Sequence, residues 1–294
     1  MNVLITGGSG RLGRCLIGEL MRHGHAVCAL DVARPEGEPC RFVVADLLRY
    51  ETLPRLVSGF DAVVHLARKR FPYTEKGYDP ASGTWKIPDA PDDAETFARN
   101  VEMTYNVLAA ACDAAVRKIV VGSSLAVYGF YYPLRPSWPE YVPVDEGHPR
   151  RPQDPYGLSK LIGEELGESF SRRSGAQVAS LRFSGIYTED HRALLLERKK
   201  NPTIRGTGAL WSYVDVRDAA RACRLALEAD FAGCENFNIC APVTLMDSTT
   251  PELVGRHLPH GVELREKSNT NWSGYSTRKA REMLGFEASF LFAG

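Results

Sequence analysis

The sequence contains no two cysteines in a C-x-x-C spacing, although seven cysteines are scattered over its 294 residues. An odd number without a repeated spacing is not a disulfide framework, and it is not the ligand pattern of a structural zinc site. We therefore expect reduced thiols, no bound metal and a cytoplasmic location.

An excess of charge of one sign is also missing, because 36 lysine and arginine residues balance 36 aspartates and glutamates. Binding to nucleic acid or to an anionic membrane would need a basic excess or a basic face. Apolar runs are far shorter than the ~20 residues that cross a bilayer, and the first residues lack the regions of a signal peptide. We expect neither nucleic acid nor a membrane as a partner, but a small molecule.

What the chain does contain is a regular alternation of short apolar runs and helical patterns. Continuous apolar strands, each followed by a helix, favour a parallel sheet that is covered on both faces. The predicted fold class is α/β, a doubly wound parallel sheet of the Rossmann type. Strands are expected at 2–6, 25–31, 41–45, 61–67, 118–123, 177–183 and 235–240, and helices at 11–23, 97–115, 155–174 and 216–229.

The alternation becomes irregular in the last third of the chain. A smaller C-terminal substrate-binding lobe is therefore expected beside the dinucleotide-binding domain. The domain would comprise 1–183 and 211–240, and the lobe 184–210 and 241–294. A segment rich in proline and aromatic residues, 129–155, also interrupts the alternation. Long ordered connections are often functional, and we expect the aromatic residues of this one to cover the substrate.

The segment Thr6-Gly7-Gly8-Ser9-Gly10-Arg11-Leu12-Gly13 joins the first expected strand to the first expected helix. It contains G-x-G-x-x-G, whose glycines allow a tight turn and close approach of the backbone to a pyrophosphate at the helix N-terminus. Asp31 ends the second expected strand, where its carboxylate would accept ribose hydroxyls and repel a 2′-phosphate. The predicted cofactor is NAD rather than NADP, although Arg34 could pair with such a phosphate.

Tyr156 and Lys160 are four residues apart at the start of an expected helix and so share one of its faces. A tyrosine ordinarily has a pKa of about 10 and is a weak base, but a neighbouring ammonium and an oxidised nicotinamide favour the phenolate. Ser123 and Ser124 end the fifth expected strand, at the sheet edge where ligands of open α/β folds bind. A hydroxyl there could bind the reacting oxygen.

These segments together resemble the extended short-chain dehydrogenase/reductase family, specifically its NAD-dependent epimerase/dehydratase branch, over most of the chain. The glycine segment is similar to the family's T-G-x-x-G-x-x-G loop. Further segments are similar to its D-L, H-x-A, N-V-x-x-T-x-N-V-L, S-S-x-x-V-Y-G, Y-x-x-S-K, Y-V-x-V-x-D and K-A-x-x-x-L-G motifs. They lie at Asp46-Leu47, 65–67, 100–108, 123–129, 156–160, 213–218 and 279–285.

The resemblance implies Ser124, Tyr156 and Lys160 as catalytic residues. Ser123 is disfavoured, because the family's serine lies four residues before the tyrosine of V-Y-G. The implied NAD contacts are Gly7, Gly10, Arg11, Leu12, Gly13, Asp31, Asp46, Leu47, Leu66, Ala67, Asn100, Tyr156 and Lys160. The implied substrate contacts are Ser124, Ala126, Tyr128 and Arg182. A homodimer formed through the helices near 97–115 and 155–173 is also implied.

Two departures from the nucleotide-sugar members affect the expected substrate. Those members usually carry an asparagine where this chain has Gly185 and an arginine where it has Ala209, and both groups normally hold the nucleotide diphosphate. Only 18 residues separate Tyr187 from Gly206, which is short for a uridine-binding lobe. A sugar, sugar acid or lactone is therefore expected. Its single carboxylate or phosphate could be bound by Arg182, Arg192 or Arg205.

The predicted function is that of an NAD-dependent oxidoreductase or epimerase acting on a secondary hydroxyl of a sugar or sugar acid. The motifs do not separate a dehydrogenase from an epimerase, and a UDP-hexose 4-epimerase is the first alternative. A dehydratase is disfavoured, because Leu125 and Ala126 supply no acidic pair after the serine. A non-catalytic dinucleotide sensor is the second alternative, although such proteins typically lose the tyrosine or the lysine.

Overall fold

The computed structural model describes residues 1–292 except 38, 70–77, 80–83, 86–89 and 203–208. The helices are α1 (Arg11–Arg22), α2 (Leu53–Val57), α3 (Ala90–Asp113), α4 (Pro155–Ser174), α5 (Arg192–Lys200), α6 (Val216–Glu228), α7 (Thr250–His257) and α8 (Arg278–Leu284). The longer strands are β1 (Asn2–Thr6), β2 (Ala26–Asp31), β3 (Arg41–Val44), β4 (Ala62–His65), β7 (Lys118–Ser124), β9 (Gln177–Phe183) and β12 (Cys234–Ile239). The short strands are β5 (Tyr78–Asp79), β6 (Thr84–Trp85), β8 (Tyr141–Val142), β10 (Ile186–Tyr187), β11 (Val214–Asp215) and β13 (Glu263–Leu264).

The seven longer strands form one parallel sheet in the order β12-β9-β7-β4-β1-β2-β3. The chain runs outward from β1 to β3, returns to β4 beside β1, and then runs outward in the other direction. This reversal defines the topological switch point of a doubly wound sheet, and ligands bind beside it at the carboxyl edge. The predicted fold class is therefore confirmed.

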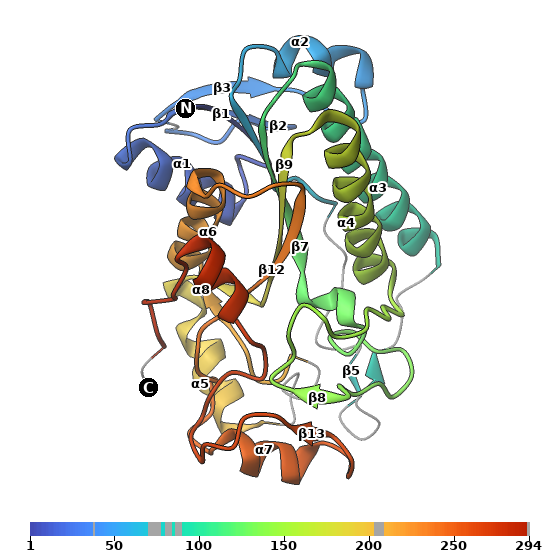
Figure 1. Ribbon diagram of the computed structural model, residues 1–294, viewed down its shortest axis with the longest axis vertical. Coiled ribbons are helices and arrows are strands. Elements are labelled where there is room, and N and C mark those ends of the chain that lie inside the picture. Colours follow the sequence, from blue (N-terminus) through green and yellow to red (C-terminus); the bar gives the residue numbers. More distant parts are fainter. Residues whose placement is uncertain (38, 70–77, 80–83, 86–89, 203–208, 293–294) are drawn as a thin grey trace.

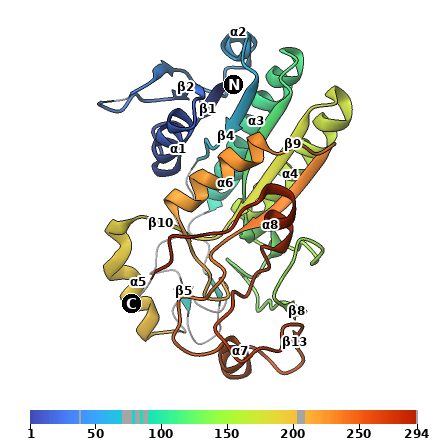
Figure 2. The ribbon, with the colours of Figure 1, turned by 60° about the vertical axis from the view of Figure 1, so that its left-hand side comes forward.

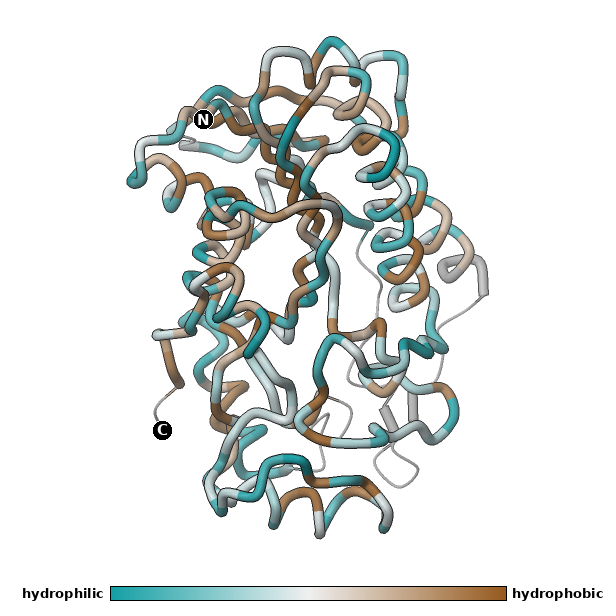
Figure 3. Tube along the Cα trace, viewed as in Figure 1, coloured by the Kyte–Doolittle hydropathy of each residue, from teal (hydrophilic) through white to brown (hydrophobic). Residues whose placement is uncertain are grey.

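Helices cover both faces of the sheet, with α1 and α6 on one side and α3 and α4 on the other (Figures 1 and 2). Successive β1 side chains alternate between these layers, since Val3 and Ile5 pack with α1 and α6 whereas Leu4 packs with α3. Figure 3 accordingly shows hydrophobic residues concentrated along the central strands. Burial on both faces explains the continuous apolar runs of the sequence.

A third apolar cluster lies beyond the carboxyl edge of the sheet, where Figure 1 shows α7, β8 and β13. It joins buried side chains of the segment between β7 and α4, such as Phe130 and Val142, to side chains of the C-terminal part, such as Trp211 and Leu253. β8 pairs in parallel with β13, and β10 with β11. The proline-rich segment after β7 therefore packs against residues far along the chain.

Element boundaries match the expectations best where the sequence carries strong signals. α4 and β9 have the predicted bounds, whereas α3 begins at Ala90, seven residues before the expected start. α2, α5 and the five short strands β5, β6, β8, β10 and β11 were not expected. Leu195 is the only buried residue of α5, so its apolar periodicity is weak. No helix in the described part of the chain is long and apolar enough to span a bilayer.

Candidate active site

At Gly7 and Gly13, the loop between β1 and α1 has room for backbone atoms but not for a side chain. Gly7 has a φ of +77°, and a Cβ there would lie 2.6 Å from the backbone nitrogen of Ala67. A Cβ at Gly13 would lie 2.3 Å from the carbonyl oxygen of Gly7, so glycine is required for α1 to begin against the loop. The backbone N–H groups at the start of α1 are thereby brought to the carboxyl edge of the sheet, where they can bind phosphate.

Asp31 ends β2 beside this loop. Its carboxylate accepts the N–H of Ser9 at 3.0 Å and the N–H of Val32 at 2.7 Å. These two hydrogen bonds fix the carboxylate next to the loop, at the pocket end that Asp46 and Leu47 also line. An acidic group in this position can accept the hydroxyls of an adenosine ribose.

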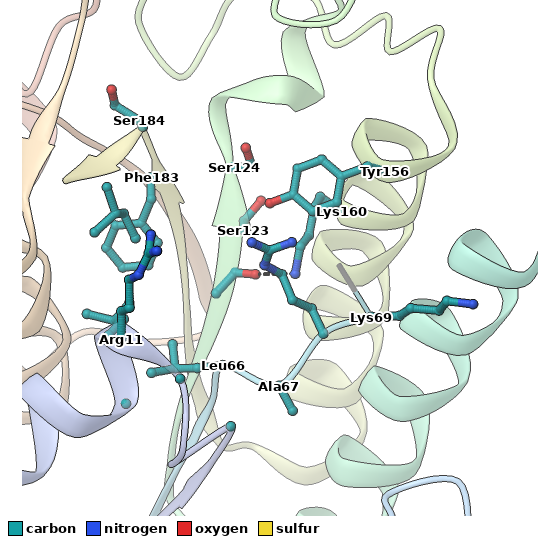
Figure 4. A pocket seen from close by; sticks show the side chains of 18 of the residues that line it. Arg11, Leu66, Ala67, Lys69, Ser123, Ser124, Tyr156, Lys160, Phe183 and Ser184 are labelled. Atoms are coloured by element: carbon teal, nitrogen blue, oxygen red, sulfur yellow. Dashed lines mark hydrogen bonds between the residues drawn. The ribbon is translucent and has the colours of Figure 1, made fainter. Parts of the chain in front are cut away.

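A pocket of about 1100 Å³ extends from this end along the carboxyl edge of the sheet. Pockets for single small ligands span roughly 300–1000 Å³, so this one has room for a cofactor and a small substrate together. Figure 4 shows Arg11 and Phe183 on one side of the pocket and Tyr156 and Lys160 on the other. The sequence-predicted residues that line it are Gly7, Gly10, Arg11, Leu12, Gly13, Asp31, Asp46, Leu47, Leu66, Ala67, Ser124, Tyr156 and Lys160.

The first turn of α4 places Tyr156 and Lys160 at the pocket. The helix begins after Asp154, whose carboxylate accepts the N–H of Gly157 at 2.8 Å. A Cβ at Gly157 would lie 2.8 Å from the carbonyl oxygen of Ala126, in the turn that follows β7. Because glycine has no Cβ, the start of α4 approaches the end of β7, and Figure 4 shows Tyr156 and Lys160 pointing from α4 toward that strand.

The two serines at the end of β7 differ in what their hydroxyls bind. Ser123 Oγ donates to Glu164 Oε1 at 2.6 Å, so its proton is used within the protein. Ser124 Oγ accepts the N–H of Ala126 at 3.2 Å, which leaves its own proton for a ligand in the pocket. This geometry supports Ser124 as the residue that would hold a substrate oxygen.

Lys160 is buried, and its Nζ donates to the carbonyl oxygen of Gly122 at 2.7 Å and lies 5.8 Å from the ring centre of Tyr156. Burial, assisted by the positive charge of Arg68, lowers the pKa of Lys160 to about 7, while Glu164 acts in the opposite direction. An ammonium held in such surroundings gains from any negative charge that develops beside it.

Asn100, an expected NAD contact, does not line the pocket. Its side chain is buried, accepts the N–H of Lys69 at 2.7 Å and donates to the carbonyl oxygen of Lys69 at 3.3 Å. Asn100 therefore holds the segment after β4, whose residues Leu66 to Lys69 form part of the pocket wall.

His65, of the H-x-A motif, is a buried histidine behind the same wall. Its ring nitrogens are hydrogen-bonded to Thr6 Oγ1 at 2.7 Å and to Thr104 Oγ1 at 3.2 Å. Burial and the charge of Lys160 lower the pKa of His65 to about 3, so the ring is neutral at physiological pH. It joins β1, β4 and α3 and has no access to a ligand.

The expected substrate contacts Ala126, Tyr128 and Arg182 are also absent from the pocket lining. All three are buried in the protein. Arg182 pairs with Glu164 through contacts of 2.9 and 2.8 Å and donates to the Tyr128 hydroxyl at 2.8 Å. Because this guanidinium is saturated by internal partners, it serves to connect β9 to α4 behind the site.

Several pocket residues were not identified from the sequence. Arg68 directly follows the H-x-A motif at the carboxyl end of β4, and this position is the signal that could have identified it. His191 and Arg198 come from the segment around α5, and His191 is hydrogen-bonded to Arg11 at 2.9 Å across the pocket.

The other expectations for the substrate end have different outcomes. Tyr131 and Tyr132, of the aromatic segment after β7, line the pocket as expected. Arg192 is exposed, with Glu189 at 3.9 Å, and Arg205 lies outside the described residues.

Glycines without room for a Cβ, a fixed Asp31 carboxylate and a buried Lys160 fit a dinucleotide. A model described as the NAD dependent epimerase/dehydratase family matches residues 3–240. The chain belongs to this family. It is an NAD-dependent enzyme of the extended short-chain dehydrogenase/reductase type, and NAD is its cofactor. In the described residues no group of three His, Cys, Asp or Glu side chains is arranged to hold a metal ion.

Relatives of the chain include both dehydrogenases and epimerases. An L-arabinose 1-dehydrogenase (NAD(P)(+)) of Haloferax volcanii is 28% identical over 77% of this chain and 82% of the relative. A UDP-glucose 4-epimerase of Corynebacterium glutamicum is 27% identical over 97% of this chain and 90% of the relative. A crystal structure of a short-chain dehydrogenase/reductase superfamily protein from Agrobacterium tumefaciens with bound NAD is 26% identical. It covers 99% of this chain and 93% of its own, with a TM-score of 0.69.

Proposed function

We propose that the enzyme oxidises a secondary hydroxyl of a free sugar or sugar acid, which is the first step of both a dehydrogenase and an epimerase. The observation that carries the proposal is the pocket wall at Gly185. A Cβ there would lie 2.9 Å from the ring of Tyr187 and 3.2 Å from the hydroxyl of Tyr131, so these two tyrosines occupy the space that an asparagine side chain would need. Arg198 binds the Tyr187 hydroxyl and holds that ring in place.

The other position of the diphosphate clamp supports the same proposal. Ala209 lines the pocket and contributes no charge. A diphosphate left without charge-assisted partners would lose contacts worth roughly 1.5–3 kcal/mol each. A substrate without a nucleotide therefore fits this wall better than a nucleotide sugar.

Three side chains carry the proposed chemistry. Bound NAD supplies the hydride acceptor. Tyr156 removes the proton from the substrate hydroxyl, and the Ser124 hydroxyl donates a hydrogen bond to the same oxygen. Lys160, held by the carbonyl of Gly122, stabilises the negative charge that Tyr156 carries as base.

The proposal is tested with a panel of aldoses, uronic acids and nucleotide sugars in the presence of NAD. Accumulating NADH absorbance with a free sugar identifies a dehydrogenase, and an epimeric product without NADH identifies an epimerase. Calorimetry of the NAD-loaded protein with UDP and UDP-glucose is the second measurement. Micromolar binding of either would contradict the proposal and favour a UDP-hexose 4-epimerase, the candidate to which the Corynebacterium relative points.

We also propose a homodimer, a cytoplasmic location and the expected division into two domains. α3 and α4 pack side by side, and Tyr105 and Leu158 on these helices are 47% and 39% exposed although they are apolar. A second copy of the chain would cover both side chains, and light scattering coupled to gel filtration measures the mass. No disulfide joins any of the seven cysteines, all of which lie within the described residues, and this is typical of a reducing compartment.

A further inference from the structure

Positive side chains outnumber negative ones in the lining of the pocket. Among the described lining residues six are cationic and three are acidic. The cationic ones are Arg11, Arg68, Lys69, Arg99, Lys160 and Arg198, and the acidic ones are Asp31, Asp46 and Glu95. The protein as a whole is neutral, so this excess belongs to the pocket and not to the composition.

The three carboxylates are placed away from the catalytic tyrosine or are already neutralised. Asp31 and Asp46 follow β2 and β3, where they accept the backbone N–H groups of Ser9 and Leu48. Glu95 pairs with Lys69 and also with Arg99, the latter at 2.7 Å. Among the described residues that line the pocket, no carboxylate therefore balances the charge beside Tyr156.

Arg68 is a cationic lining residue that has no acidic partner in the described part of the chain. Its guanidinium carbon lies 5.5 Å from the ring centre of Tyr156, and in the described part of the chain no carboxylate lies within ion-pair distance of it. The side chain is exposed to the pocket. Its charge contributes to the lowered pKa of Lys160, so the two cations are close enough to repel each other. An anionic group bound between them would relieve this repulsion.

We propose that Arg68 binds the carboxylate of the substrate and that the enzyme therefore acts on sugar acids in preference to neutral sugars. The proposal rests on the proposed function and names its substrate class. A guanidinium presents two parallel N–H groups that match a carboxylate, which a neutral sugar cannot exploit. The cofactor phosphates are the other source of negative charge in the pocket. We expect those phosphates to bind at the N-terminus of α1. Arg68, in contrast, extends from the end of β4 to Tyr156.

The test compares kcat/KM for D-galacturonate and D-glucuronate with kcat/KM for D-galactose and D-glucose. We expect the wild type to prefer the acids. Arg68→Gln should lower kcat/KM for the acids at least tenfold more than it lowers kcat/KM for the neutral sugars, since a hydrogen bond to a charged group is lost only with the acids. Arg68→Lys, which keeps the charge but not the fork, should fall between the two.

Arg99→Gln is the matched control, because it removes a positive charge from the same pocket at a residue that already has an acidic partner. It should change acids and neutral sugars equally. A readout without turnover comes from the Tyr156→Phe background, in which calorimetry measures binding of D-galacturonate to the NAD-loaded protein. Adding Arg68→Gln should weaken that binding at least tenfold.

Three results would overturn the proposal. The first is oxidation of acids and neutral sugars with equal kcat/KM by the wild type, which leaves the proposed function intact. The second is an Arg68→Gln protein that binds NAD tenfold more weakly and loses activity on all four sugars alike, because Arg68 would then contact the cofactor phosphates. The third is epimerisation of UDP-glucose without oxidation of any free sugar, which rejects the proposed function as well.

Discussion

The two ends of the pocket are formed by different kinds of groups, mainly backbone at one end and side chains at the other. The cofactor end uses backbone N–H groups of the glycine loop and three residues at or after the ends of β2 and β3, namely Asp31, Asp46 and Leu47. The sugar end uses side chains from distant segments, such as Tyr132, Phe183, Arg198, Trp211 and Met246. Glycines that meet backbone atoms tolerate no substitution, whereas a wall of side chains can change one residue at a time. The cofactor is thus fixed by the fold, and the substrate by a replaceable surface.

The largest effect is expected where the two ends meet, at Tyr156. Tyr156→Phe should lower kcat by about 10²–10⁴-fold, because it removes the phenol that we propose as the base. The dissociation constant for NAD should stay within about twofold, because the glycine loop and Asp31 are untouched. Steady-state kinetics and a cofactor titration measure both. Tyr132→Phe, whose ring lies 6.3 Å from that of Tyr156, is the control. Turnover within tenfold of the wild type would reject Tyr156 as the base.

The next effect concerns the ion pair that connects β9 to α4. Glu164→Gln should lower the free energy of unfolding by about 3–5 kcal/mol, because Arg182 would keep a buried charge without its partner. Glu165→Gln is the control, since Glu165 binds Arg150 as Glu164 does but is half exposed. Urea denaturation of both variants measures the difference. Equal losses would show that the buried pair does not stabilise the site.

The next prediction concerns the pH dependence of stability that results from the buried His65. Its pKa is about 3 in the folded protein, below its ordinary value of 6.5. Between these values the unfolded chain binds a proton that the native state does not, so stability is lost as the pH falls, by at most about 1.4 kcal/mol per pH unit. His65→Gln should therefore show a shallower decline of stability between pH 6.5 and 4. Parallel curves for the variant and the wild type would contradict a neutral, buried ring.

The smallest effect is expected at Asp31. Asp31→Ala should weaken NAD binding several-fold and improve NADP binding, because the repulsion of a 2′-phosphate disappears and Arg34 can pair with it. Fluorescence titration with both cofactors gives the ratio. Substrate preference among sugars should not change, since Asp31 lies at the other end of the pocket. A wild type that already prefers NADP would show that Asp31 does not select the cofactor.

The sequence could predict what depends on local spacing. The glycine loop, Asp31, and Tyr156 with Lys160 all follow from short motifs whose residues meet within one turn or one βα unit. The role of Arg182 could not be predicted, because its partner Glu164 becomes a neighbour only when β9 and α4 pack. From the sequence alone Arg182 is expected to contact the substrate, whereas in the fold its side chain is buried.

The lobe beyond the sheet shows the same limit. The ring of Tyr187 fills the space beside Gly185. The sequence shows that this position is a glycine, but it does not show which side chain occupies the space beside it. Arg68 has no motif of its own and gains meaning only because it lies over Tyr156. Charged α5 has too weak an apolar face to be predicted as a helix. Contacts between distant segments, rather than spacing, decide these features.

The pairing of Asn100 with Lys69 has a consequence for the residue next to it. Both backbone groups of Lys69 are bound by the side chain of Asn100. The backbone carbonyl of Asn100 is connected to β1 through Thr104 and His65. The Lys69 amide should exchange with deuterium as slowly as amides of the sheet. Arg68 thus extends from a preorganised base, and a bound anion would restrict only its side-chain rotamers. Ordering a loop on binding commonly costs entropy, but this segment is already ordered in the folded protein.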